Sequence, residues 1–551
     1  MKITHYAFKL FLALTICFSC SNSDPGITQP PEEEPITPSD TTELEDKEAC
    51  NIKGYVKCGE TGIPNVAVSD GVTVTKTDIK GRYWLKSDSN RSEYVFISIP
   101  SNYEVPTKNH LLPQFYQRIN NNDGKTVEQH DFTLIKRNNM NHAMFVVADI
   151  HISGRITYNG ETKKYRDIDS VCFKKDFLPI FQQTVHNTSI PTYCISLGDQ
   201  VQDKYWKTNN TSFPEYLSVV QPMNVPTFHV IGNHDHDPDV CNIASDDTEY
   251  LAGAVYRKYL GPENYSFNIG KVHYIMLDDV YYVNTKSDSD TDGNKEYQPK
   301  LTNAIWNWLE QDIKAISSSI THIVIGLHIP TNRTNPIASM SYCLQDRERL
   351  YNLCNGYITT ILSGHNHLSE VVNIRPNVTE YIHTAICGNW WYEEFGKDGA
   401  PASFYKYEFN GDTMERSTYD YTNNTAYGYS TGDKPFRIYN KKITDLNGDP
   451  AILLNYWDWD NTCTIRVTEN GKSVKEIHQI NPSSDSYYAP AYDPLYKNLW
   501  DRKVISQNVP SVTPYKTHHM FIYTPQDKTA AIKITIVDRF KREWTINTSI
   551  Q

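Results

Sequence analysis

The sequence predicts an α/β layered domain between two β-rich domains, and three observations carry this prediction. The chain has 551 residues, and at roughly 150 residues per domain this length fits three or four domains. Between residues 139 and 415, apolar runs alternate with segments of helical spacing, as in α/β layers. The flanking stretches carry short runs rich in Val, Thr and Tyr, and the chain has 38 Tyr against 19 Phe, which favours β structure.

The composition excludes some classes of protein. Hydrophobic residues make up 39% of the chain, which is too apolar for a wholly disordered protein. The 53 Lys and Arg against 65 Asp and Glu leave a net charge of −12. This balance argues against nucleic acid as a stable partner, because phosphate backbones are bound by clustered Lys and Arg.

Residues 1–20 have the features of a lipoprotein-type signal peptide. Two lysines lead into the apolar run 10–18, which is too short to span a bilayer, and a serine precedes Cys20. We therefore expect Cys20 to become the lipidated first residue of a bacterial cell-envelope lipoprotein, periplasmic or at the cell surface. The membrane would then be contacted through this lipid only. Plain secretion and an uncleaved anchor stay open as alternatives.

Two segments separate this signal from the middle domain. Residues 21–49 contain five Pro and nine Asp or Glu, a composition typical of an extended acidic tether. Residues 50–138 show short alternating strands with turns between them, which predicts a small β-sandwich. Its expected strands include Ile52–Cys58, Val72–Thr75, Tyr94–Ile99 and Phe132–Ile135, with a strand–turn–strand over Thr77–Leu85.

Residues 139–415 predict the α/β domain. The run Met144–Ala148 is apolar throughout, as in strands buried on both faces, and residues 301–313 have helical spacing. Residues 416–551 return to β patterns and predict a second all-β domain. The further strands expected in the α/β domain are Tyr193–Leu197, Thr227–Ile231, His273–Leu277, Ile323–Leu327 and Tyr357–Leu362, and those of the last domain are Ala451–Tyr456, Cys463–Val467, His519–Tyr523 and Ala531–Val537.

Polar side chains come directly after the predicted strands of the α/β domain. Because sites form at the carboxyl ends of strands in open α/β sheets, these segments could deliver their side chains to one edge. Glycines before three of them let the backbone turn sharply or approach closely. The segments are Asp149-Ile150-His151, Gly198-Asp199, Gly232-Asn233-His234-Asp235, Gly326-Leu327-His328 and Gly364-His365-Asn366-His367.

The residue types in these segments suit metal ions. Two carboxylates, several imidazoles and one carboxamide favour borderline divalent metals such as Mn, Fe, Zn or Ni over Ca or Mg. Two divalent ions would bring four positive charges, against three negative charges from two carboxylates and a bridging hydroxide. The remaining positive charge would attract an anionic phosphate and stabilise the transition state.

The ordered set strongly resembles the calcineurin-like metallophosphoesterase family, with its D-x-H, G-D, G-N-H-D, later H and G-H-x-H blocks. Residues 62–83 resemble the carboxypeptidase-regulatory-like β-sandwich, which precedes catalytic domains in secreted bacterial enzymes. The whole chain is similar to a three-domain exported bacterial subgroup of the family. The resemblance implies a four-layer αββα sandwich, flanked by an N-terminal β-sandwich and a C-terminal all-β domain.

The same resemblance implies roles for individual residues. His234 would be catalytic, as a general acid or as a contact to the phosphoryl oxygen. A hydroxide bridging two divalent ions, each Mn, Fe, Zn or Ni, would attack phosphorus in line. The implied ligands are Asp149, His151 and His367 for the first metal, Asn233, His328 and His365 for the second, and Asp199 as a bridge between both.

The sequence departs from two branches of the family. Purple acid phosphatases have a tyrosine ligand three residues after the bridging aspartate, where this chain has Gln202. The protein Ser/Thr phosphatases carry G-D-x-x-D-R-G, whereas here the second aspartate is displaced by one position, to Asp203, and the Arg-Gly pair is missing. These departures argue against a tyrosine–iron site and against a protein phosphatase.

Four further residues are candidates for contacts near the site. Trp390 and Trp391 follow the last motif and could line the substrate pocket or instead contact the C-terminal domain. Arg333 could contact phosphate or lie on the surface. His236 is expected on the surface, with a substrate contact as the alternative.

The sequence thus predicts an exported dinuclear-metal phosphoesterase that hydrolyses a phosphomonoester or phosphodiester of a small phosphorylated substrate. The alternative is a surface glycan- or ligand-binding lipoprotein in which the metal site is structural. A potential acid such as His234 beside the metals favours the enzyme, because a purely structural site has no need of one.

Overall fold

The computed structural model describes residues 43–87, 91–121, 123, 125–159, 164–241, 246–283, 296–334, 340–391, 394–420, 434–445, 447–474, 477–480, 492–502 and 513–551. The predicted signal peptide, Cys20 and the predicted tether up to residue 42 lie outside these ranges. None of the helices within them is long and apolar enough to cross a bilayer. The description below concerns the unit Leu44–Gln551.

The N-terminal part is a β-sandwich, and Leu44 packs against it. Leu44 is buried, its backbone N–H donates to the Gln129 side chain, and its carbonyl accepts from Lys53 Nζ. Leu44 lies inside the predicted tether, which extends to residue 49. The end of that segment therefore packs against the sandwich. One sheet is built around β1 (Ile52–Cys58), which has the predicted bounds, and pairs it with β2 (Thr61–Gly62), β5 (Arg82–Leu85), β11 (Glu128–Gln129) and β12 (Phe132–Thr133); the other has the order β10 (Tyr116–Arg118), β6 (Tyr94–Ile97), β3 (Ala67–Ser69), β4 (Val74–Lys76).

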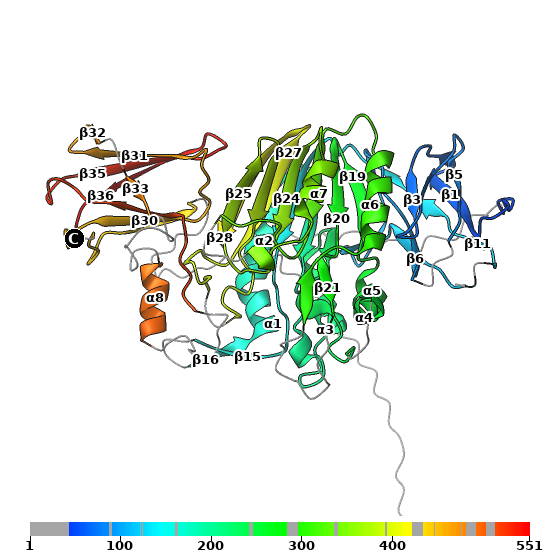
Figure 1. The fold of residues 1–551 in the computed structure, drawn as a ribbon, viewed down its shortest axis with the longest axis horizontal. Helices are drawn as coiled ribbons and strands as arrows, with labels where there is room; N and C mark the ends of the chain where they lie inside the picture. Colours follow the sequence, from blue (N-terminus) through cyan, green and yellow to red (C-terminus); the bar gives the residue numbers. More distant parts are fainter. Residues whose placement is uncertain are drawn as a thin grey trace, which may run out of the picture. The chain divides into compact units, whose positions relative to one another are not determined.

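The central part contains two sheets between helices, the αββα architecture that the family resemblance implies (Figure 1). In β14 (Asn141–Val147) the side chains of Met144 and Val146 join the apolar cluster shared with the second sheet, while Phe145 and Val147 join a cluster with helix α2 (Leu178–His186). This alternation explains why the run from Met144 to Val147 is apolar on both faces. The first sheet has the order β18 (Thr227–Val230), β17 (Thr192–Leu197), β14 (Asn141–Val147), β27 (Ser403–Asn410), β28 (Thr413–Asp420), and the second β19 (Tyr265–Ile269), β20 (Val272–Met276), β23 (His322–Gly326), β24 (Ile358–Ser363), β26 (Val378–Ile382), β25 (Glu370–Arg375).

Helices cover the outer faces of both sheets. The predicted helix is α6 (Asn303–Ala315), which starts with a Thr302 side chain accepting from the Ile305 N–H and buries Trp308 against the second sheet, where α7 (Arg347–Leu353) also packs. The first sheet is covered by helices around Phe173, Phe181 and Tyr216. These are α1 (Asp169–Cys172), a π-helical turn (Phe173–Phe177), α2 (Leu178–His186) and α3 (Phe213–Val220).

The N-terminal sandwich shares its apolar core with the central domain. Phe96 lies edge-on to Trp308 of α6, with 6.3 Å between ring centroids, and Phe115 packs on Tyr265 of β19 at 4.8 Å. The backbone of Ile99 also forms a β-bridge to Phe267. The sandwich and the catalytic layers are therefore one packed body rather than modules joined by a linker.

The C-terminal part contains two four-stranded sheets around one apolar cluster. It also contains a helix that the sequence analysis did not anticipate, α8 (Pro494–Asp501), in which Asp493 caps the N–H groups of Leu495 and Tyr496. A capping aspartate followed by proline at the first helical position is a local start signal for this helix. The sheets have the orders β29 (Phe436–Tyr439), β30 (Ile452–Tyr456), β34 (Met520–Tyr523), β33 (His478–Gln479) and β32 (Lys472–Val474), β31 (Thr464–Glu469), β35 (Ile532–Val537), β36 (Glu543–Thr548).

Candidate metal centre

The predicted ligand residues follow the carboxyl ends of β14, β17, β18, β23 and β24, and the structure brings them together. Several of them have a left-handed backbone, with φ values of 53° at Asp149, 51° at His151 and 52° at Asp199. Non-glycine residues seldom adopt this conformation, and such residues gather where a site requires them. His365 and His367 have the same feature, with φ values of 66° and 53°.

One half of the site gathers around Asp149 and His151. His151 Nε2 lies 3.2 Å from His367 Nε2, and His367 Nε2 lies 3.4 Å from Asp149 Oδ1. Asp199 Oδ2 completes this half of the site and lies 3.5 Å from His151 Nε2. One ligand atom each of Asp149, His151 and Asp199 lies within 4.8 Å of the other two, a spacing that could hold a metal ion.

The other half gathers around His328. Its Nε2 lies 3.0 Å from Asn233 Oδ1, 3.1 Å from His365 Nδ1 and 3.3 Å from Asp199 Oδ2. Asp199, His328 and His365 form a second group spaced to hold a metal ion. Asp199 is thus common to both halves.

The orientation of His328 shows that the site fits a cation. Its Nδ1 donates to the Leu197 carbonyl at 2.9 Å, which directs Nε2 toward the oxygens of Asn233 and Asp199. Such a second hydrogen bond fixes the ring orientation of metal-binding histidines. Burial lowers the pKa of His328, but the charges of Asp199 and Asp149, together with hydrogen bonds to Asp199 and to the Leu197 carbonyl, raise it to about 10. The surroundings therefore favour positive charge at this position.

Three glycines allow the close approach that the sequence predicts. A Cβ atom on Gly198 would lie 2.4 Å from His328 Nδ1, one on Gly232 would lie 2.3 Å from Asp199 Oδ1, and one on Gly364 would lie 2.5 Å from Asp149 Oδ2. These distances are shorter than any van der Waals contact. The expectation that the glycines before Asp199, Asn233 and His365 let the backbone approach closely is confirmed.

His234 lies beside the site and is oriented by a residue that the sequence did not single out as functional. Its backbone N–H donates to Asp199 Oδ1 at 2.8 Å, and its Nδ1 lies 2.7 Å from Asp203 Oδ1. The His234 side chain is 17% exposed and that of Asp203 is 3% exposed. Burial lowers the pKa of His234, but the charges of Asp199 and Asp203 raise it to about 9. The only feature of the sequence that indicates a role for Asp203 is its position four residues after Asp199.

The other candidate contacts have different positions. The Trp390 ring lies 4.4 Å from the His151 ring and 5.8 Å from the His234 ring, measured between centroids, so it borders the site. Trp390 also packs against the cluster of Tyr496 and Leu499 in α8, so the expected contact with the C-terminal domain is present as well. Trp391 is buried in the core, where its indole N–H donates to the Ile150 carbonyl at 2.9 Å. This placement differs from both expectations for Trp391, a pocket wall and a contact to the C-terminal domain.

Arg333 and His236 also differ from expectation. The Arg333 side chain is 8% exposed and donates to Glu370 through Nε and a terminal nitrogen, at 3.1 and 2.7 Å, and to Tyr515 Oη at 2.8 Å. It therefore joins the central and C-terminal parts and lies neither on the surface nor toward a free phosphate position. The expectation that His236 lies on the surface is wrong, because its side chain is completely buried.

Two further side chains contact the ligand set without any signal in the sequence. Tyr297 Oη, from β22 (Tyr297–Pro299), lies 3.4 Å from His365 Nε2. Cys387 Sγ lies 3.8 Å from His367 Nδ1, which also faces the Gly388 carbonyl at 3.3 Å. Neither residue belongs to a motif, and only the folded chain places them at the site.

Solved structures that match parts of this chain include phosphatases and a nucleotidase. A dimetal phosphatase from Danio rerio matches with 13% identity and a TM-score of 0.36, over 51% of this chain and 96% of that chain. A purple acid phosphatase from yellow lupin seeds matches with 11% identity and a TM-score of 0.37, over 67% and 73%. A 5'-nucleotidase from Candida albicans matches with 14% identity and a TM-score of 0.30, over 51% and 52%.

Family models cover most of the chain in the expected order. The model for the N terminal of calcineurin-like phosphoesterase matches residues 50–137, that for calcineurin-like phosphoesterase matches residues 144–369, and that for the C terminal of calcineurin-like phosphoesterase matches residues 380–544. A search of curated proteins finds no match. The resemblance drawn from the motifs is confirmed: the chain belongs to the calcineurin-like phosphoesterases, in a three-domain arrangement, and is a metal-dependent phosphoric ester hydrolase.

Proposed function

We propose that the chain is a dinuclear-metal phosphoesterase that hydrolyses a small phosphomonoester or phosphodiester. The observation that supports it best is the pair of ligand groups that share Asp199. Bound divalent ions, each Mn, Fe, Zn or Ni, lower the pKa of water and neutralise charge on a phosphate ester. The proposed ligands are Asp149, His151 and His367 for one ion, Asn233, His328 and His365 for the other, and Asp199 for both.

His234 is the proposed catalytic residue. Its Nδ1 donates to Asp203 at 2.7 Å, and the charges of Asp199 and Asp203 raise the pKa of His234 to about 9. The ring is therefore protonated on both nitrogens near neutral pH, and the Nε2 proton is available for the leaving oxygen of the ester. Trp390, at the border of the site, offers a flat apolar surface for the part of the substrate that carries the phosphate. Asp203 positions His234 and does not itself touch substrate.

Initial rates on p-nitrophenyl phosphate and bis-p-nitrophenyl phosphate, with Mn²⁺ or with EDTA, test this function. We expect metal-dependent turnover, and the ratio of the two rates distinguishes a monoesterase from a diesterase. His234→Gln should lose turnover and keep its metal content, whereas His186→Gln, an exposed histidine at the end of α2, should behave as wild type. If no metal-dependent turnover is found on either ester while metal stays bound, the ligand-binding alternative gains support.

We further propose that the protein is exported and anchored in a bacterial cell envelope by a lipid on Cys20. The support is the run of two lysines, an apolar segment and Ser19-Cys20 in the sequence. Cys20→Ser should release the protein from the membrane fraction of expressing cells into the soluble fraction. A variant that stays in the membrane fraction would contradict the lipid anchor.

A further inference from the structure

A second cluster of ligand groups lies outside the ligand set described above. It consists of His236, which follows the short helical turn Asn233–Asp235, Glu249 in α4 (Asp246–Ala252), and Asp278, which follows β20. The three residues are 0%, 9% and 2% exposed. One ligand atom of each lies within 4.8 Å of the other two.

The His236 ring is held with one nitrogen aimed into this cluster. Its Nδ1 donates to the Gly232 carbonyl at 2.9 Å, which leaves the lone pair on Nε2, 4.0 Å from Glu249 Oε2. The Tyr282 ring stacks on it at 5.0 Å with an interplanar angle of 7°. Across the described ranges, Nε2 finds no hydrogen-bond partner. A buried acceptor that faces carboxylates is costly unless a cation or a proton lies between them.

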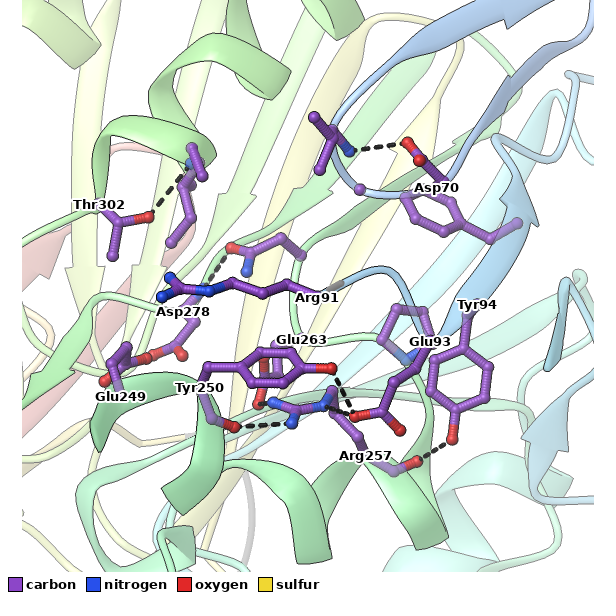
Figure 2. Close-up of a pocket in the computed structure, with 17 residues that line it drawn as sticks. Asp70, Arg91, Glu93, Tyr94, Glu249, Tyr250, Arg257, Glu263, Asp278 and Thr302 are labelled. Atoms are coloured by element: carbon purple, nitrogen blue, oxygen red, sulfur yellow. Dashed lines mark hydrogen bonds and ion pairs between the residues drawn. The ribbon is translucent and has the colours of Figure 1, made fainter. Parts of the chain in front are cut away.

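The two carboxylates of the cluster lie at one cavity, where an arginine pairs with other acids. Figure 2 shows the carboxyl groups of Glu249 and Asp278 directed toward each other at one end of a cavity. The nearby Arg257 is engaged elsewhere, at 2.8 Å from Glu93 and 2.9 Å from Glu263. In the part of the chain that the structure describes, neither Glu249 nor Asp278 forms an ion pair with lysine or arginine.

The electrostatics of the cluster agree with a missing positive charge. Burial raises the pKa of Glu249 to about 8, and burial together with the charge of Glu249 raises the pKa of Asp278 well above its usual range. Burial also lowers the pKa of His236 to about 4, so its ring is neutral and able to donate a lone pair. Two buried carboxylates and one neutral imidazole are a metal-ligand set, and without a metal the carboxylates must hold a proton.

We propose that His236, Glu249 and Asp278 bind a divalent cation, with Zn²⁺ the best fit, separate from the catalytic metal centre. Zinc binds histidine nitrogen and carboxylate oxygen at about 2.0–2.2 Å in tetrahedral geometry, so two of its ligand atoms lie about 3.4 Å apart. His236 Nε2 and Glu249 Oε2 lie 4.0 Å apart, so a small movement of the two side chains would bring both atoms onto one ion. The adjoining cavity, about 140 Å³ and lined by Glu249 and Asp278, gives access from solvent and room for water as a further ligand.

The ion would brace the loop that presents the catalytic histidine. His236 comes two residues after His234 on the same loop, while Glu249 and Asp278 belong to α4 and to the end of β20. An ion bound by all three ties that loop to the second sheet and to α4. Its role is therefore structural.

The test is the number of zinc ions per chain, measured by inductively coupled plasma mass spectrometry on the whole protein after equilibration with Zn²⁺ and removal of excess. The double variant Glu249→Gln, Asp278→Asn should carry one ion fewer than wild type. The amides have the shape of the protonated acids and preserve the packing. The matched control is Asp247→Asn on the same helix, an exposed carboxylate paired with Arg91, which should keep the wild-type count.

Equal zinc counts in wild type and the double variant would overturn the proposal and assign a shared proton to the cluster. Should the double variant fail to fold, His236→Gln removes one ligand only and is expected to lower zinc affinity at least tenfold at one site. Asp199→Asn, which disrupts the catalytic centre, should still retain the zinc ion that the double variant loses. The test measures the difference in zinc count between wild type and variants and does not measure turnover. A negative result can therefore be told apart from a failure of the proposed function.

Discussion

Replacing Asp203 by asparagine tests how His234 is held. The variant keeps the side-chain volume but removes the negative charge 2.7 Å from His234 Nδ1. Asp203 is 3% exposed at its side chain, so solvent does not screen this contact. A hydrogen bond to a charged group contributes about 1.5–3 kcal/mol, and the same free energy in the transition state corresponds to a kcat reduced about tenfold to 150-fold.

The assay is kcat and KM on whichever p-nitrophenyl ester the wild type turns over, with metal content measured on the same samples. We expect kcat to fall while KM and metal content stay near wild type, because the Asp203 carboxylate is engaged with His234 and is not one of the proposed metal ligands. Asp239→Asn serves as the control, since Asp239 is an exposed carboxylate paired with Lys207. A kcat within twofold of wild type at full metal content would refute the positioning role of Asp203.

Three other predictions follow from the geometry. Gly232→Ala should lose bound metal and turnover, because its Cβ would lie 2.3 Å from Asp199 Oδ1. A variant that keeps its metal content by mass spectrometry and its rate of turnover would contradict the close approach. Removal of metal with EDTA should lower the melting temperature measured by calorimetry, because an ion that binds only the folded chain stabilises it, and an unchanged value would count against a buried site. Arg333 lowers the pKa of Glu370 to about 2 despite burial, so this pair stabilises the fold above pH about 4.5 and ceases to do so as pH falls toward 2. In urea unfolding, Glu370→Gln should therefore have a lower free energy of unfolding than wild type at neutral pH, and the difference should shrink with acidification. A difference that does not depend on pH would refute this role of the pair.

The strands and the motif residues could be predicted because their signals are local. A strand buried on both faces must be apolar throughout, so β14, β17 and β23 are visible in the sequence, and polar residues at their ends mark the edge where ligands meet. The positions of Arg333, Trp391 and His236 could not be predicted in this way. Arg333 and Trp391 are positioned by partners far along the chain, Glu370 and Ile150, and His236 is buried under the Tyr282 ring that stacks on it.

The helix α8 shows a different limit. Its start signal, Asp493 followed by proline, was present in the sequence, but the surrounding β pattern outweighed a helix of only two turns. Asp203 shows a third limit, because its contact with His234 depends on how the turn after β17 folds back. Spacing alone cannot distinguish such a positioning residue from a solvated aspartate.

The apolar core that the N-terminal sandwich shares with the catalytic layers bears on how the protein unfolds. Since Phe96 and Phe115 pack on Trp308 and Tyr265, opening the sandwich alone would expose aromatic surface on the catalytic side as well. We therefore expect the N-terminal sandwich and the catalytic layers to unfold together, as one cooperative unit. A truncated protein that begins at the first catalytic strand would carry this apolar surface into solvent and aggregate, so the N-terminal sandwich acts as an obligatory part of the enzyme's fold.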